Sequence, residues 1–174
     1  MTAAPNSSAR SFSLLATLLL ASLGLLGTGC EYYEKPNRPM PDLGLVALDG
    51  TPITLESMKG TAWVINIWLP GCSSCVREIP DLESARAEFE PRGVRFLAIS
   101  IVDDPEAAKH AAAKVGLSMA IATATGPVLG ALGLGQVPST VFVSKDGRVV
   151  ALASGERGRT FFQRRAAELL VARP

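Results

Sequence analysis

The sequence predicts an α/β fold in which a central mixed β-sheet is flanked by helices. Two segments, 61–68 and 94–102, are apolar almost throughout, as is typical of strands buried on both faces of a sheet. Helical patterns lie between the predicted strands, and strands joined by helices form parallel sheets. A hairpin pattern at 139–154 adds antiparallel strands near the end of the chain.

The composition is that of one globular domain. Of the 174 residues, 48% are hydrophobic and 19% are charged, which is too apolar for a disordered chain. The 17 basic and 16 acidic side chains almost cancel, and no basic cluster is present. Because nucleic-acid binding usually requires a strongly basic face, we expect no nucleic-acid partner.

The first thirty residues have the pattern of an export signal. Arg10 precedes an apolar stretch at 12–26, whose length of about 15 residues suits a signal peptide better than a membrane span of about 20. Gly27-Thr28-Gly29-Cys30 follows and resembles the lipobox of bacterial lipoproteins, although Gly27 stands where that motif prefers leucine. We expect residues 1–29 to be a signal peptide and Cys30 to be lipidated. A permanent N-terminal anchor and simple cleavage are the alternatives, and each exports the domain, to face the periplasm or the cell exterior.

Residues 30–41 are predicted to be the lipidated cysteine and an extended linker. The segment is polar and contains Pro36, Pro39 and Pro41, a composition typical of extended spacers. It would hold a folded domain, residues 42–174, away from the membrane.

Start and stop signals place the elements of this domain. Asp49-Gly50 and Asp146-Gly147 are turn sequences that each join two strands. Asp104 and Pro105 begin a helix that stops at Gly116. In chain order we predict strands at 43–48, 52–55 and 61–68, a helix at 73–90, a strand at 94–102, a helix at 105–115, a strand at 119–124, a short helix at 127–134, strands at 139–144 and 148–154, and a helix at 160–172.

Two cysteines form a pair at the start of a predicted helix. Cys72 and Cys75 are separated by two serines and follow the buried strand 61–68. The amide groups and dipole of a helix's first turn stabilise negative charge, so a thiol there ionises readily. Cys72 would be the exposed, attacking thiolate, and Cys75, nearly one turn further on, would resolve the mixed disulfide. We expect this redox-active pair, with no metal and no other cofactor.

Two further residues are candidates for the same site. Glu78 lies three residues after Cys75 on the same helix face, where a shielded carboxyl group could take the proton of the thiol. An exposed surface glutamate is the ordinary alternative. Pro80 should kink this helix. Val137-Pro138 precedes the strand 139–144, and the pattern alone does not decide between a cis and a trans bond.

Several motifs match one family in order and spacing over roughly 130 residues. They are Pro41-Asp42, Asp49-Gly50, Leu55 with Lys59-Gly60, Asn66-Ile67-Trp68, the cysteine pair with Glu78 and Pro80, Val137-Pro138-Ser139-Thr140, and Asp146-Gly147. With these motifs the chain resembles the TlpA/ResA-type thioredoxin-like thiol:disulfide oxidoreductases, exported and membrane-tethered members of the redoxin superfamily.

The resemblance implies a thioredoxin fold with an additional N-terminal β-hairpin and a central insertion, which residues 103–123 would form. It implies that Pro138 is cis and packs opposite the cysteines, and that Glu78 is the active-site acid. We also expect Trp68 and Val137 to contact the substrate.

The resemblance further implies partners. Its clients would be proteins with disulfides or dithiols, such as apocytochrome c or proteins with copper-site cysteines, and a membrane thiol reductase would donate the electrons. The chain departs from the family at Gly71, where tryptophan is usual, and in the dipeptide Ser73-Ser74. The direction of the redox reaction therefore stays open.

Three other functions are also open. A copper- or zinc-binding module could use the two thiols, but structural zinc normally has four ligands and His110 is the only histidine. The copper-transferring Sco proteins resemble this scaffold, but they carry a CxxxC spacing and a further histidine. A peroxidase of the peroxiredoxin type would need a Pro-x-x-x-Thr-x-x-Cys pattern, which neither Cys72 nor Cys75 has. The third is a non-catalytic interaction domain.

Overall fold

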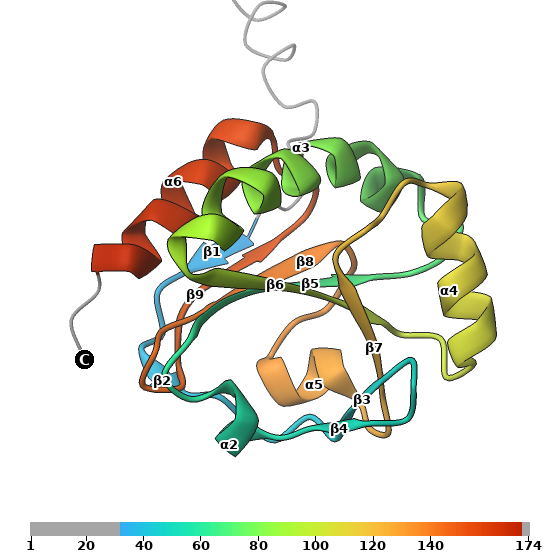
Figure 1. Ribbon diagram of the computed structural model, residues 1–174, viewed down its shortest axis with the longest axis horizontal. Helices are drawn as coiled ribbons and strands as arrows, with labels where there is room; N and C mark the ends of the chain where they lie inside the picture. Colours follow the sequence, from blue (N-terminus) through green and yellow to red (C-terminus); the bar gives the residue numbers. More distant parts are fainter. Residues whose placement is uncertain (1–31, 172–174) are drawn as a thin grey trace, which may run out of the picture.

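The computed structural model describes residues 32–171, which build a nine-stranded mixed sheet with helices on both faces (Figure 1). The strands are β1 Tyr32–Glu34, β2 Arg38–Pro39, β3 Leu45–Ala47, β4 Pro52–Ile53, β5 Ala62–Trp68, β6 Val94–Ser100, β7 Ala120–Ala124, β8 Ser139–Val143 and β9 Arg148–Ser154. The helices are α2 Leu55–Met58, α3 Ser73–Phe89, α4 Pro105–Lys114, α5 Val128–Leu132 and α6 Arg159–Val171. The predicted mixed sheet and flanking helices are confirmed.

The centre of the sheet is parallel and its margins are antiparallel. The strand order is β1-β9-β8-β5-β6-β7-β3-β4, with β2 also beside β9. β5, β6 and β7 run parallel, whereas β8 pairs antiparallel with β5 and forms a hairpin with β9. β5 is buried along almost its whole length, which explains the continuous apolar run in the sequence.

The predicted N-terminal hairpin and central insertion meet at one edge of the sheet. β3 pairs with β4 across the Asp49-Gly50 turn and with β7 on its other side. α4 and β7 occupy the predicted insertion. Leu55, predicted to end a strand, instead begins α2. The reason is a capping box, in which the side chains of Thr54 and Ser57 each accept the backbone N–H of the other.

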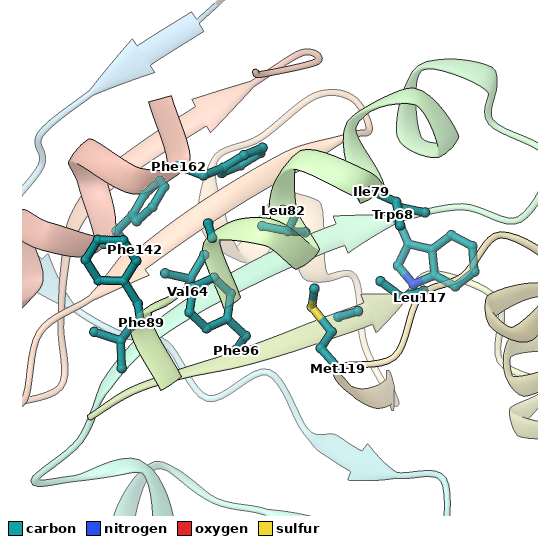
Figure 2. Packing of buried hydrophobic residues seen from close by; sticks show 14 of the residues in the cluster. Val64, Trp68, Ile79, Leu82, Phe89, Phe96, Leu117, Met119, Phe142 and Phe162 are labelled. Carbon is teal, nitrogen blue, oxygen red and sulfur yellow. The ribbon is translucent and has the colours of Figure 1, made fainter. Parts of the chain in front are cut away.

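Two hydrophobic clusters fill the space between the sheet and its helices. On one face α3 and α6 pack over the sheet, and Phe89, Phe96, Phe142 and Phe162 are almost fully buried (Figure 2). On the other face Leu132 of α5 is completely buried. α3, which carries the cysteines, is thereby fixed to the sheet along its apolar side.

The N-terminal segment differs from the free spacer predicted for it. β1 pairs antiparallel with β9, with Tyr32 opposite Ser154, and β2 pairs with β9 further along. The extended backbone that prolines favour is also the backbone of a strand, so the outer edge of β9 satisfies its hydrogen bonds. Tyr32–Glu34 and Arg38–Pro39, which the sequence analysis placed in the linker, are therefore strands of the folded sheet.

The predicted signal peptide, residues 1–29, and the predicted lipidation site Cys30 lie outside the described residues. Between Tyr32 and Val171, no helix is long and apolar enough to cross a membrane. Export and lipidation stay predictions.

Candidate active site

The cysteine pair lies where β5 passes into α3. After Trp68 the chain turns, and the N–H of Cys72 donates to the carbonyl of Leu69 at 3.1 Å. Gly71 has a φ of +83° in this turn, a left-handed conformation that residues with side chains disfavour. The glycine that departs from the family pattern therefore fits the backbone found here.

Cys72 caps the N-terminus of α3. Its Sγ accepts the backbone N–H of Cys75 at 3.2 Å and lies 3.3 Å from the Oγ of Ser74. This N–H and the dipole of the first helical turn both stabilise negative charge on the sulfur, an arrangement that favours a thiolate. The predicted position at a helix start is confirmed.

Cys72 and Cys75 are joined by a disulfide, with their Cα atoms 5.3 Å apart. Cys72 is half-buried, whereas Cys75 is only 1% exposed. Of the two sulfurs, the one that solvent or a partner can reach is that of Cys72.

Glu78 is buried beneath this motif, which excludes the alternative of an exposed surface glutamate. Its carboxyl group accepts the side-chain amide of Asn66 at 2.8 Å on Oε1 and the backbone N–H of Arg157 at 3.1 Å on Oε2. Burial is the largest influence and raises the pKa of Glu78 to about 7, while these two hydrogen bonds act in the opposite direction. A carboxyl group with this pKa can both take and return a proton near neutral pH.

Asn66 is a site residue whose role the sequence analysis missed. Its Nδ2 also lies 3.1 Å from the Oγ1 of Thr140, so it links Glu78 to both β5 and β8. A signal was present, because an amide in an otherwise apolar, doubly buried strand must have hydrogen-bond partners. Arg157 had no such signal, since its contact with Glu78 comes from a backbone N–H that any residue except proline can supply.

The Val137-Pro138 bond is cis, as the family resemblance implied. Ser139 pairs with Ile67, which places Pro138 at the end of the sheet where β5 leads into the cysteine turn. The carbonyl of Pro138 accepts the N–H of Gly155 at 2.9 Å. Val137 is half-buried and packs, as Cys72 does, against the same hydrophobic cluster as Trp68.

Trp68, which was expected to contact the substrate, is buried. The side chain is 1% exposed and lies in the hydrophobic cluster, because it points from β5 toward the helical layer (Figure 2). Its Nε1 is buried and has no hydrogen-bond partner among residues 32–171. Trp68 therefore supports the site from within the core.

A cavity of about 260 Å³ lies on the side of the sheet edge where β6 ends. It lies at the carboxyl ends of β6 and β7, and its lining includes Ile101, Pro127 and Leu129. The N–H of Ile101 donates to the carbonyl of Trp68 at 3.1 Å, so the cavity adjoins the strand end from which the cysteine turn starts. Within the described part of the chain, no group of three or more His, Cys, Asp or Glu side chains is arranged to hold a metal ion.

This arrangement defines the class of the protein, a thiol:disulfide oxidoreductase with a thioredoxin-like fold. The family model described as Redoxin matches residues 35–170. The chain therefore belongs to the Redoxin family, and the predicted fold, family and enzyme class are confirmed.

Individual relatives agree with this assignment. The chain is 29% identical over 125 residues to the thiol-disulfide oxidoreductase ResA of Bacillus thuringiensis (strain Al Hakam), a match that covers 71% of this chain and 69% of that protein. It is 28% identical over 148 residues to ResA of Geobacillus thermodenitrificans (strain NG80-2), covering 82% and 85%. The crystal structure of a thiol:disulfide interchange protein of the thioredoxin family from Chlorobium tepidum TLS superposes with a TM-score of 0.66 at 24% identity, over 79% of this chain and 99% of that one.

Proposed function

We propose that the protein works outside the cytoplasm and reduces disulfide bonds in specific exported proteins through Cys72 and Cys75. The observation that carries the proposal is the unequal exposure of the pair. Cys72 is half-buried at the helix start, whereas Cys75 is enclosed and followed one turn later by the buried Glu78.

The first step is attack by Cys72. In the reduced protein its thiolate, stabilised by the N-terminus of α3, attacks one sulfur of the client disulfide. A bond forms between Cys72 and the client, the client disulfide breaks, and one client cysteine leaves as a thiolate, which takes up from solvent the proton that Cys72 lost on ionising.

The second step uses Cys75 and Glu78. Cys75 gives its proton to the Glu78 carboxylate and attacks the sulfur of Cys72, which releases the second client sulfur. The proton returns to that leaving thiolate from Glu78. Two electrons and two protons have then passed from the dithiol to the client, and the protein is left with the Cys72–Cys75 disulfide seen in the structure.

Client contact would come from the surface around Cys72. We propose that Val137 contacts the client backbone or side chain next to the target cysteine, and that the neighbouring cavity accepts an apolar client side chain. Ile101, which is 36% exposed, lies in the wall of this cavity. Apolar pockets beside a reactive group commonly fix substrate orientation.

The partners and the location rest on the family resemblance and the N-terminal sequence. The clients would be apocytochrome c or proteins with copper-site cysteines, and a membrane dithiol reductase would reduce the Cys72–Cys75 disulfide again. Lipid on Cys30 would hold the protein at the membrane on the periplasmic or outer side.

Covalent trapping tests the proposal. Cys75→Ser should leave Cys72 joined to its client in a mixed disulfide that survives denaturing, non-reducing electrophoresis and disappears on reduction. The matched variant Cys72→Ser should trap no client, because its remaining thiol is enclosed. Equal trapping by both variants, or trapping by Cys72→Ser alone, would overturn the proposed order of attack.

A further inference from the structure

The loop between β9 and α6 contacts two parts of the candidate site through its backbone. The N–H of Gly155 donates to the carbonyl of the cis-proline Pro138 at 2.9 Å. Two residues later the N–H of Arg157 donates to the carboxyl group of Glu78 at 3.1 Å. The conformation of this loop therefore decides whether the buried acid keeps one of its two hydrogen bonds.

The side chain of Arg157 ties the loop to the N-terminal strand. Its Nη2 donates to the carbonyl of Ser154 at 3.0 Å and to the carbonyl of Tyr32 at 3.1 Å. The guanidinium group also lies 5.1 Å from the centre of the Phe161 ring, within the range of a cation–π contact. Because Tyr32 belongs to β1, one side chain connects that strand to the loop that holds Glu78.

β1 is held in place by side chains of α6 as well as by its pairing with β9. The ring of Tyr33 packs edge-on against Phe161, with 5.8 Å between the ring centres. The guanidinium group of Arg165 lies 5.1 Å from the centre of the Tyr33 ring and also donates to the Tyr33 hydroxyl. Phe161 thus contacts both Tyr33 and Arg157.

From these contacts we infer that Arg157 is a positioning residue, which keeps its backbone N–H on Glu78, and that the docked strand β1 keeps Arg157 in place. The N-terminal strand then supports the active-site acid through Arg157. The inference deepens the proposed function and rests on it, since it takes Glu78 as the acid of the exchange.

The charges around Glu78 give the direction of the effect. Asn66 faces the carboxyl group from β5, with Thr140 of β8 behind it, and both are uncharged. From the loop, Arg157 lowers the pKa of Glu78 through its N–H and its charge, while the charge of Glu156 raises it. Glu156 is itself paired with Arg77 of α3, with 2.6 Å between Nη2 and Oε2. Loss of the Arg157 guanidinium should therefore raise the pKa of Glu78 further.

The test is a direct titration of Glu78 in the oxidised protein, in which neither cysteine titrates. ¹³C NMR of glutamate-labelled protein would follow the carboxyl signal, assigned by its loss in Glu78→Gln. Arg157→Met should move the titration midpoint upward by about half a pH unit or more. Arg157→Lys, which keeps the charge but not the forked donors, should move it less. Tyr33→Ala, which loosens β1 without touching the loop, should move it in the same direction.

The matched control is Arg159→Met, because Arg159 is an exposed arginine two residues further on that pairs with Asp81 at 3.5 Å. It should leave the midpoint unchanged. An unchanged midpoint in Arg157→Met and Tyr33→Ala, or an equal shift in Arg159→Met, would overturn the inference. If Glu78→Gln exchanges disulfides at the wild-type rate while Arg157→Met still shifts the titration, the acid role fails and the positioning role stands.

Discussion

The side-chain amide of Asn66 lies between Glu78 and Thr140, with Nδ2 2.8 Å from Glu78 Oε1 and 3.1 Å from Thr140 Oγ1. All three residues are buried, and they come from β5, α3 and β8. The proton equilibrium of Glu78 is therefore set by residues of the sheet as well as by the loop between β9 and α6.

Asn66→Ala should raise the pKa of Glu78 above its value of about 7. The hydrogen bond from the Asn66 amide favours the carboxylate and lowers the pKa, so its removal leaves the pKa-raising effect of burial less opposed. Infrared absorption of the protonated carboxyl group, followed against pH in the oxidised protein, measures the change. Thr140→Val is the control, since it removes the outer partner of Asn66 and leaves the bond to Glu78. A shift in Thr140→Val as large as that in Asn66→Ala would show that the amide bond is not the cause.

Glu78 should also make stability depend on pH. Its pKa is about 7 in the folded protein against an ordinary value of 4.5, so between these values the folded protein binds a proton that the unfolded chain has released. The contribution of Glu78 to the free energy of unfolding is therefore fully present below pH 4.5 and is lost as the pH rises through 7. At 1.36 kcal/mol per pKa unit, the loss is about 3 kcal/mol.

Urea unfolding of the oxidised protein at pH 5 and pH 8 measures this loss. Glu78→Gln should abolish most of the pH dependence, at a cost of about 1 kcal/mol at pH 5, because Asn66 and Arg157 donate to different carboxyl oxygens and the NH2 group that replaces one of them cannot accept. Glu106→Gln, a change in an exposed carboxylate of α4, should keep the wild-type dependence. Parallel pH curves for wild type and Glu78→Gln would contradict the assignment.

Most of the fold could be predicted because its central elements carry their own signals. β5 is buried on both faces and therefore apolar throughout, and the helix α4 begins at Asp104, whose carboxylate accepts the N–H of Glu106 at 3.0 Å. β1 and β2 could not be predicted in the same way. They are only three and two residues long and include Glu34, Arg38 and Pro39, and they are strands because the edge of β9 is available to them.

The site also contains residues that the sequence indicates and residues that it does not. The spacing of the two cysteines and Glu78 indicated them as candidates, and the family resemblance indicated the cis-proline. Arg157 could not be found, since the sequence does not reveal which loop supplies a backbone N–H to a distant carboxyl group. Trp68 was assigned to substrate contact because it precedes the cysteine turn, whereas its side chain is buried, as β5 is on both of its faces.

Glycine should be required at position 71, in the turn before Cys72, because its backbone is left-handed and not because a side chain would collide with a neighbour. An added Cβ would meet nothing within 4 Å, but φ is +83°. Gly71→Ala should therefore lower the free energy of unfolding by about 1–2 kcal/mol, the cost of a left-handed conformation for an L-residue. Urea unfolding measures it.

Gly135→Ala is the matched control for this change. Gly135 also has open space around its Cα, but its φ is not in the left-handed range. The free energy of unfolding of Gly135→Ala should be at most about 1 kcal/mol lower than that of wild type, or it should be higher. An equal loss in both variants would mean that φ at Gly71 is not what selects glycine there.

Trp68→Phe and Val137→Ala should show that Trp68 supports the site from the core and that Val137 contacts the client. Trp68 is fully buried and its Nε1 has no partner in the described part of the chain, so phenylalanine removes volume but no hydrogen bond. We expect a loss of about 1–3 kcal/mol in stability and an unchanged KM.

Val137 is half-buried at the site, and its truncation should raise KM several-fold with little effect on kcat, since it removes a contact that is made before the reaction. Steady-state reduction of a peptide with an oxidised CxxCH sequence measures both. A raised KM in Trp68→Phe, with Val137→Ala unaffected, would restore the tryptophan as a client contact and remove Val137 from the site.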